Sequence, residues 1–277
     1  MSRDVFVDAD WLEERLHDER VRIVDARSEH HGPSGIEQFE EAHIPGAVHL
    51  DYATDLADPA TPYAKRVVPA ERFAEVIGEA GISDTTAVVA YDNGDVPFAA
   101  RMLWMLRYYG HDDVRILAGG LREWAARGKP LSKERVHHPR AAFTPRVRPQ
   151  LRATLEEVRA IADGATRAQF VESQRDQTYA LRDRAIPNSV RLSASALLED
   201  ERGGRITANE TLRNLVRASG LDPHKRTITS CGSGVGASGA YLALLEAGFD
   251  EVAVYDGSWL EWSHDQTLPT VPKERLG

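Results

Sequence analysis

The stretch from Thr229 to Phe249, T-S-C-G-S-G-V-G-A-S-G-A-Y-L-A-L-L-E-A-G-F, contains the only cysteine of the chain, Cys231. The residues before Cys231 predict a short strand, and the apolar run after the glycines predicts a helix. Glycines in such a loop let the backbone curl so that successive N–H groups point inward, and the helix N-terminus adds partial positive charge. We therefore expect an anion-binding loop that lowers the pKa of the Cys231 thiol.

Four interpretations of this loop compete. A free cysteine is commonly a small buried hydrophobe. A dinucleotide site is the second, because Gly234–Gly239 reads G-x-G-x-x-G and Asp256 follows at a suitable distance, although only about twenty residues remain after Asp256 for further strands. A cysteine phosphatase needs an arginine where Ala237 stands, and a P-loop needs Gly-Lys-Ser/Thr. The fourth is sulfur transfer, in which inward N–H groups stabilise a persulfide formed on the thiolate.

The surroundings of the loop are duplicated within the chain. Val88–Trp124 parallels Ile228–Trp262: each runs from a short apolar strand through a glycine-containing loop to an apolar helix, a second strand, a turn and a helix ending in tryptophan. Asp92 stands in the first copy where Cys231 stands in the second. A repeated strand–helix pattern predicts two similar domains.

The duplication extends upstream. V-D-A-R at Val24–Arg27 precedes H-I-P-G-A-V-H-L-D at His43–Asp51, and the weaker counterparts are V-E-S-Q at Val171–Gln174 and A-I-P-N-S-V-R-L at Ala185–Leu192. The second copy is therefore the more divergent of the two over this interval.

A segment without helical or alternating periodicity separates the copies. It holds three prolines and many charges, so we predict a linker over 136–151 between domains 1–135 and 152–277. The fold class is α/β, with a mainly parallel sheet flanked by helices on both faces in each domain. Ligands of such sheets bind beyond the carboxyl ends of the strands, where Cys231 and Asp92 are both expected.

Composition limits the function further. The chain has 277 residues, a net charge of −9 and a pI near 5.6, which disfavours nucleic acid and anionic membranes as partners. No apolar run is long enough for a signal peptide or a spanning helix, so a cytoplasmic location is expected. A single cysteine excludes an intramolecular disulfide, and the ten histidines form no ligand motif, so we expect no metal.

The two copies together resemble the tandem-domain rhodanese sulfurtransferases. The motifs that carry the resemblance are H-I-P-G-A-V-H-L-D, L-R-Y-Y-G-H, L-A-G-G-L-R-E-W, C-G-S-G-V and Y-D-G-S-W-L-E-W. The resemblance implies that the first copy is inactive and that Cys231 in the second carries a persulfide. It implies transfer of sulfur from a small donor to a thiol, cyanide or a thioredoxin-like acceptor, without a cofactor.

The loop after the cysteine bears on the donor. In this family C-R-K-G-V is typical of thiosulfate-type members and C-G-S-G-V-T of 3-mercaptopyruvate-type members. Gly232, Ser233, Gly234 and Val235 match the second form, while Gly236 replaces its threonine. The resemblance thus implies 3-mercaptopyruvate as the preferred donor and thiosulfate as the other candidate, with Ser233 either polarising the donor or capping the loop.

Donor recognition is implied by the resemblance for two arginines. Related enzymes hold the substrate carboxylate with arginines before the second H-I-P-G-like segment, where this chain offers Arg182 and Arg184. The family's R-F-x-G run is absent and Ala185 replaces its histidine, so surface positions for these arginines are the alternative. His43 of the first copy is a candidate for catalytic assistance or for packing.

Other residues are expected to be structural. Asp25 and Arg27 should brace the end of the first strand. A non-enzymatic rhodanese-fold module that carries sulfur or docks a partner is the alternative to an enzyme, and the divergent V-E-S-Q and A-I-P-N-S segments motivate it.

Overall fold

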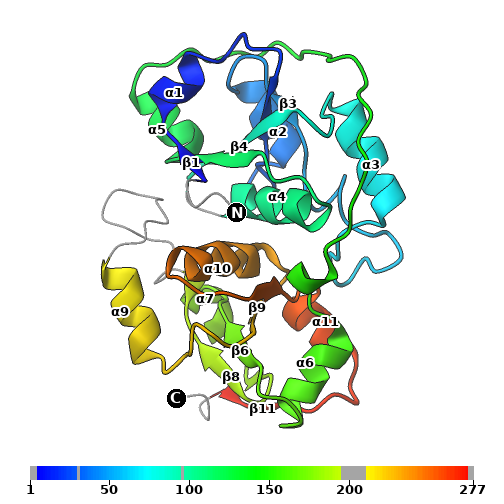
Figure 1. Ribbon diagram of the computed structural model, residues 1–277, viewed down its shortest axis with the longest axis vertical. Helices are drawn as coiled ribbons and strands as arrows, with labels where there is room; N and C mark the ends of the chain where they lie inside the picture. The colour runs from blue at the N-terminus through cyan, green and yellow to red at the C-terminus, as the bar shows by residue number, and fades with distance from the viewer. Residues whose placement is uncertain (1–4, 30–31, 95–96, 195–209, 274–277) are drawn as a thin grey trace. The chain divides into compact units, whose positions relative to one another are not determined.

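The structure, a computed structural model, describes residues 5–29, 32–94, 97–194 and 210–273. The chain divides into two compact units (Figure 1): unit 1 comprises Met1–Ala60 and Val67–Arg148, and unit 2 comprises Thr61–Arg66 and Pro149–Gly277. The six residues Thr61–Arg66 thus group with the second copy, a feature that the sequence pattern did not indicate.

Unit 1 is built on a five-stranded parallel sheet with the order β1-β5-β4-β2-β3. Its strands are β1 (Phe6–Val7), β2 (Val21–Asp25), β3 (Val48–His49), β4 (Ala87–Tyr91) and β5 (Val114–Leu117). Its helices are α1 (Ala9–Glu13), α2 (Gly35–Glu41), α3 (Ala70–Glu79), α4 (Phe98–Tyr108) and α5 (Gly120–Ala126).

Unit 2 repeats this plan with a four-stranded parallel sheet in the order β10-β9-β6-β8. Its strands are β6 (Gln169–Glu172), β8 (Ser189–Arg191), β9 (Thr227–Ser230) and β10 (Val252–Val254), and β7 (Arg184–Ala185) pairs antiparallel with β11 (Val271–Pro272). Its helices are η1 (Pro149–Leu151), α6 (Leu155–Ala162), α7 (Asp176–Ala180), α9 (Glu210–Ala218), α10 (Val235–Glu246) and α11 (Ser258–His264).

Helices flank the sheet of unit 2 on both faces, with α6 and α11 on one side and α10 on the other in Figure 1. Val158 and Ile161 of α6 pack with Trp262 of α11 against Phe170 and Ile228 of the sheet. The predicted α/β class with parallel sheets covered by helices is confirmed for both units.

Helix α10 has no polar face, because its own residues are apolar on every side. A helix of this kind is expected to be buried, and most residues of α10 are. It begins directly after Gly234, whose φ of 88° lies in the left-handed region that glycine adopts without strain. This glycine turns the chain from the end of β9 into the helix within the few residues that follow Cys231.

The segment predicted as a linker runs along unit 1 without a helix or strand as far as Arg148. Its backbone is nevertheless held, because Ala141 N donates to Gly78 O at 2.9 Å and Arg146 N donates to Tyr109 O at 2.8 Å. These hydrogen bonds attach the segment to α3 and to the end of α4.

Asp25 and Arg27 brace the end of β2, as expected. Arg27 Nη2 donates to Asp25 Oδ2 at 2.6 Å, and the hydroxyl of Tyr91 donates to the same carboxylate at 2.6 Å. Both partners of the ion pair are buried, so the pair fixes the carboxyl end of β2 against β4.

Candidate active site

Cys231 lies at the carboxyl end of β9, which is the position expected for a ligand site of a parallel sheet. Its sulfur accepts a hydrogen bond from Gly234 N at 3.2 Å, and the backbone N–H groups of Ser233 and Ala237 also bond to it. Two of these N–H groups, of Ser233 and Gly234, belong to the loop Gly232 to Gly236 from which the ring was predicted, and α10 starts within the same turn. The third belongs to Ala237, which the sequence singled out only as the position where a phosphatase would need an arginine.

The prediction that the loop lowers the pKa of the Cys231 thiol is wrong. We expected a lowered value, whereas the pKa of Cys231 is raised from 9.0 because the thiol is buried and because the Glu172 carboxylate opposes a second negative charge. Hydrogen bonds from Ala237, Ser233 and Gly234 lower the pKa but do not offset these effects. Only 4% of Cys231 is exposed, so desolvation is larger here than in an open loop.

This arrangement leads to a pH prediction. Alkylation of Cys231 in the free protein should still accelerate above about pH 9, because only the thiolate reacts and its pKa is raised. Glu172→Gln should move the midpoint of the rate–pH profile downward, since the opposing charge is removed. Stopped-flow alkylation across the pH range measures both, and a wild-type midpoint below pH 8 would contradict the expectation.

Glu172 reaches the site because β6 and β9 are neighbours, with Glu172 paired in register with Ser230. Its side chain is 1% exposed, and its Oε2 accepts a hydrogen bond from Arg182 Nη2 at 2.8 Å. Its Oε1 accepts one from Gln174 N at 2.9 Å. The carboxylate is therefore fixed in orientation and fully paired.

Arg182 is brought into this cluster. Its guanidinium lies over the rings of Trp259, at 4.4 Å, and Tyr179, at 4.6 Å, so two aromatic faces hold it. Its Nε and Nη1 are buried and have no hydrogen-bond partner among the described residues. A buried guanidinium with unused donors is poised to bind an anion.

Arg184 lies elsewhere in unit 2. Its side chain is exposed and donates from Nη2 to Thr270 O at 3.0 Å and from Nε to the Thr270 hydroxyl, beside the β7–β11 pair. The two arginines that the sequence grouped together therefore have different surroundings.

The remaining predicted loop residues contact Cys231 through the backbone or border it. A Cβ added to Gly236 would lie 3.3 Å from Cys231 Cβ and 3.5 Å from its sulfur, so a side chain at this position would crowd the cysteine. A Cβ on Gly232 would lie 3.2 Å from Gln174 Nε2. Val235 is buried as the first residue of α10.

His43 lies in unit 1, where it is 0% exposed. Its ring stacks on Phe39 at 3.8 Å, with Nδ1 2.7 Å from Phe39 O and Nε2 3.0 Å from Glu134 O. Both ring nitrogens thus face carbonyl oxygens within the unit, an arrangement typical of packing; catalytic assistance stays a prediction.

In unit 1, Asp92 occupies the position that corresponds to Cys231. Its carboxylate accepts hydrogen bonds from Gly94 N at 2.7 Å and from Ala99 N at 2.9 Å, at the start of α4. A carboxylate thus lies near the helix N-terminus of the first copy, at the place where the second copy has the thiol.

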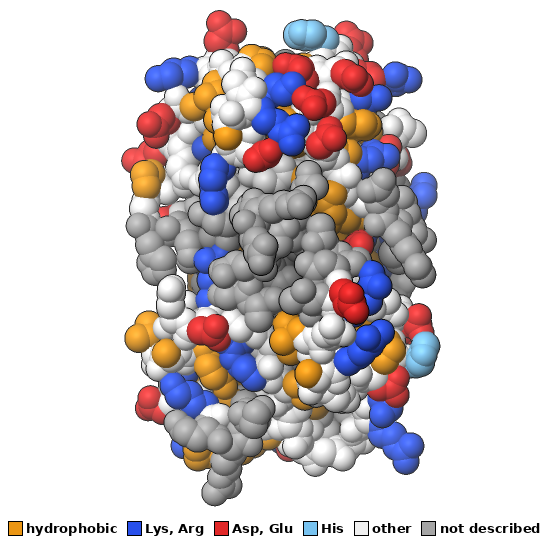
Figure 2. Space-filling view, turned by 90° about the vertical axis from the view of Figure 1, so that its left-hand side faces the viewer, with side chains coloured by type: hydrophobic (Ala, Val, Ile, Leu, Met, Phe, Trp, Pro, Cys, Tyr) orange, Lys and Arg blue, Asp and Glu red, His pale blue; other side chains and the backbone are white. Residues whose placement is uncertain are grey.

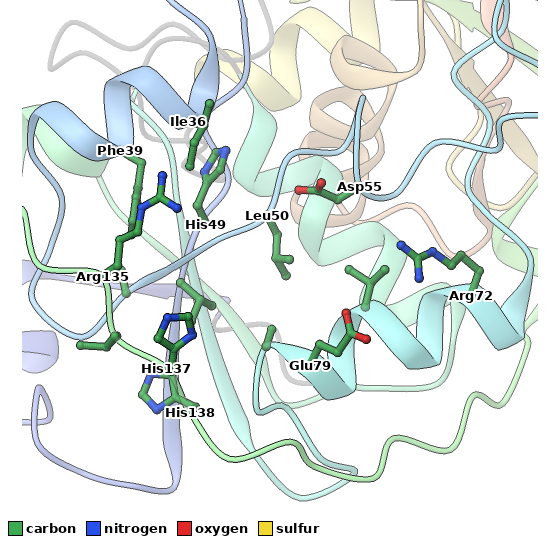
Figure 3. A pocket seen from close by; sticks show the side chains of 15 residues that line it. Ile36, Phe39, His49, Leu50, Asp55, Arg72, Glu79, Arg135, His137 and His138 are labelled. Carbon is green, nitrogen blue, oxygen red and sulfur yellow. The ribbon is translucent and has the colours of Figure 1, made fainter.

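A separate cavity of about 340 Å³ lies in unit 1 (Figure 3). Fifteen described residues line it, among them three histidines, His49, His137 and His138. Two lining arginines pair with glutamates outside the wall, Arg72 with Glu75 and Arg135 with Glu40. None of these fifteen described residues is a cysteine, serine or threonine, so they supply no thiol or hydroxyl nucleophile.

Neither a metal-binding cluster nor a membrane-spanning helix occurs in the part of the chain that the structure describes. No cluster of three or more His, Cys, Asp or Glu side chains there has the geometry to hold a metal ion. Within the same residues, no helix combines the length and apolarity needed to cross a bilayer.

On the face seen in Figure 2, basic and acidic side chains are interspersed rather than segregated.

Comparisons with known proteins agree with this geometry. The Rhodanese-like domain family matches residues 8–127 and 150–265. The chain is 33% identical to a 3-mercaptopyruvate sulfurtransferase of Escherichia coli (98% of this chain, 99% of the relative) and 31% identical to a putative thiosulfate sulfurtransferase of Mycobacterium bovis (94% of each). The crystal structure of SseA from Escherichia coli, described as a 3-mercaptopyruvate sulfotransferase with the rhodanese fold, superposes with a TM-score of 0.84 at 30% identity, over 92% of this chain and 99% of that one. The chain therefore belongs to the family of rhodanese-like proteins and carries two such domains in tandem.

Proposed function

We propose that this protein is a sulfurtransferase that moves a sulfur atom from a small anionic donor to a nucleophilic acceptor and carries it as the sulfane sulfur of a persulfide on Cys231. The observation that carries the proposal is the single cysteine at the end of β9 with the N–H groups of Ser233, Gly234 and Ala237 bonded to its sulfur. Unit 2 is the catalytic copy. Unit 1 is inactive because the carboxylate of Asp92 takes the place of the thiol.

The reaction proceeds in two transfers. The Cys231 thiolate attacks the sulfur of 3-mercaptopyruvate, and the new S–S bond forms as the C–S bond of the donor breaks. The departing carbon keeps the electron pair of the C–S bond. It then takes up the proton of the donor thiol to give pyruvate. A thiol, cyanide or a thioredoxin-like protein then attacks the outer sulfur and releases the Cys231 thiolate. The N–H groups of the loop stabilise negative charge on sulfur in each intermediate.

Donor binding is assigned to the polar groups beside the loop. Arg182, with two nitrogens that have no hydrogen-bond partner among the described residues, binds the donor carboxylate, and the Ser233 hydroxyl polarises the donor; Ser233 is only partly buried. Arg184 is assigned to a contact with the donor anion as it enters from solvent, because its side chain is exposed.

Charge favours the monoanionic donor. The loop of Gly232 to Gly236 contains no lysine or arginine, and the nearby cation of Arg182 is already paired with Glu172. Thiosulfate, a dianion, would add a second negative charge next to the buried Glu172 carboxylate, which costs more in a site with little water.

A donor prediction follows from this charge balance. The value of kcat/KM should be at least about tenfold higher for 3-mercaptopyruvate than for thiosulfate, since a tenfold ratio needs only about 1.4 kcal/mol of differential binding. With cyanide as the acceptor, release of pyruvate measures the reaction of 3-mercaptopyruvate. Formation of thiocyanate measures the reaction of thiosulfate in a separate assay. Equal values, or a preference for thiosulfate, would contradict the proposed donor.

A non-enzymatic carrier or docking module is the second candidate. The observation that favours it is the burial of Cys231, which is 4% exposed and has a raised pKa. Absence of turnover with both donors, in protein that is folded and has a reduced thiol, would support this candidate. A cytoplasmic location and the absence of nucleic-acid and membrane partners stay predictions.

A further inference from the structure

Ser258, the first residue of α11, has an unusual backbone. Its φ is 51°, in the left-handed region that disfavours every residue with a Cβ, and it is 0% exposed. Only three described residues other than glycine have a positive φ in this chain. A serine retained in such a conformation at the carboxyl end of the sheet indicates that its side chain has a function there.

The duplicated turn of unit 1 shows that the corner does not need a serine. Gly120, with a φ of 58°, occupies the corresponding place in L-A-G-G-L-R-E-W. In both units the next N–H donates to the carbonyl at the strand end: Leu121 N to Asp92 O at 2.8 Å, and Trp259 N to Cys231 O at 3.0 Å. Glycine thus suffices to build the same connection.

The serine side chain contributes a contact that glycine lacks. Ser258 Oγ accepts a hydrogen bond from Cys231 N at 3.1 Å and donates one to Tyr255 O at 2.7 Å. The donation to Tyr255 fixes the hydroxyl hydrogen, so a lone pair is directed at the Cys231 N–H. The backbone of Cys231 is therefore held on two sides, through its N–H by the Ser258 hydroxyl and through its carbonyl by the Trp259 N–H.

We propose that Ser258 is a positioning residue that holds the backbone of Cys231 so that the sulfur stays over the N–H groups of Ser233, Gly234 and Ala237. The proposal rests on the function proposed for Cys231. The hydroxyl contacts neither donor nor acceptor; it acts through the cysteine. A small displacement of a nucleophile from its stabilising donors lowers the rate of the chemical step more than it changes binding.

Ser258→Gly tests the proposal, because glycine relieves the left-handed strain and removes only the hydroxyl. We expect a folded protein whose kcat falls about 10- to 100-fold while KM stays within about twofold. The alkylation midpoint of Cys231 should also rise, since the sulfur loses part of its N–H contacts. Ser258→Ala should show the same kinetic loss together with a lower melting temperature, because the strain remains.

Asn188→Gly is the matched control. Asn188 has a φ of 60° in the same unit, and its Nδ2 donates to Ile161 O and Ala162 O, so the variant relieves similar strain without altering the contacts of Cys231. Its kcat should equal that of the wild type.

Two outcomes would overturn the proposal. One is wild-type kcat and an unchanged alkylation midpoint in folded Ser258→Gly; the other is failure of Ser258→Gly to fold, which would make the hydroxyl a requirement of the fold. Absence of turnover in the wild type would instead count against the proposed function, and the alkylation midpoint would still decide the role of Ser258.

Discussion

Replacement of Cys231 by serine is expected to abolish sulfur transfer while leaving unit 2 folded. A hydroxyl at this position cannot form a persulfide, and its pKa is far too high for the loop to ionise it. We expect turnover to fall at least about a thousandfold, as when a covalent nucleophile is removed from other enzymes. Serine fits the space of the thiol, so melting temperature and circular dichroism should change little.

Persulfide formation gives the sharper measurement. Wild-type protein treated with donor and no acceptor should gain the mass of one sulfur atom, located on Cys231, whereas Cys231→Ser should gain none. Ser219→Ala is a suitable control, because its hydroxyl donates to Val216 O in the last turn of α9 and the variant should behave as the wild type. Turnover that persists in Cys231→Ser would require a different nucleophile, since the chain has no other cysteine.

The sequence was informative where structure is encoded locally. The residues before Cys231 predict the strand, and the glycines and apolar run after it predict the loop and the helix, while the duplication identifies Asp92 as the counterpart of Cys231 without any coordinates. Once two parallel strands are recognised, the rule that ligands bind at their carboxyl ends places the cysteine in a site.

The sign of the thiol pKa could not be obtained in this way. It is a sum of opposing effects, and the two that raise it, burial and the carboxylate of Glu172, depend on how tightly α10 packs and on which strand lies next to β9. The favourable N–H groups are visible in the sequence as glycines, while the desolvation that outweighs them is not.

The ion pair of unit 2 shows a second limit. In unit 1 the acid and arginine of V-D-A-R pair within one strand end, as Asp25 with Arg27. Unit 2 keeps an acid, Glu172, but has Gln174 in place of the arginine, and the guanidinium comes from Arg182, ten residues from Glu172 along the chain. The sequence comparison detected a divergent segment; only the fold shows that the pair was rebuilt from another residue.

Ser258 could have been detected from the duplication. It aligns with Gly120 in a turn that shares the preceding glycine and the following Glu and Trp, so the serine in place of a glycine was visible as a departure, whereas the positive φ of both residues was not. Its hydrogen bond to Cys231 was not visible, because the two residues are separated by a helix and a strand.

Arg182→Met is expected to have the second largest effect, on stability and on donor binding. Arg182 and Glu172 are buried, with side chains 7% and 1% exposed, and removal of one partner leaves an uncompensated charge in the interior. Breaking such a pair costs about 3–5 kcal/mol. Arg184→Met is the matched control for stability alone, because Arg184 is exposed and its replacement should change the free energy of unfolding by less than about 0.5 kcal/mol.

The double variant Glu172→Gln/Arg182→Met separates the structural role of Arg182 from its role in donor binding. Neutralising both partners removes the buried charge, so most of the lost stability should return. If Arg182 also binds the donor carboxylate, KM for 3-mercaptopyruvate should remain at least about tenfold above the wild-type value in the double variant, because no second cation replaces the guanidinium. Recovery of both stability and KM would instead show that Arg182 serves unit 2 only as the partner of Glu172, and the donor contact would then have to be sought among the remaining polar groups at the carboxyl end of β9.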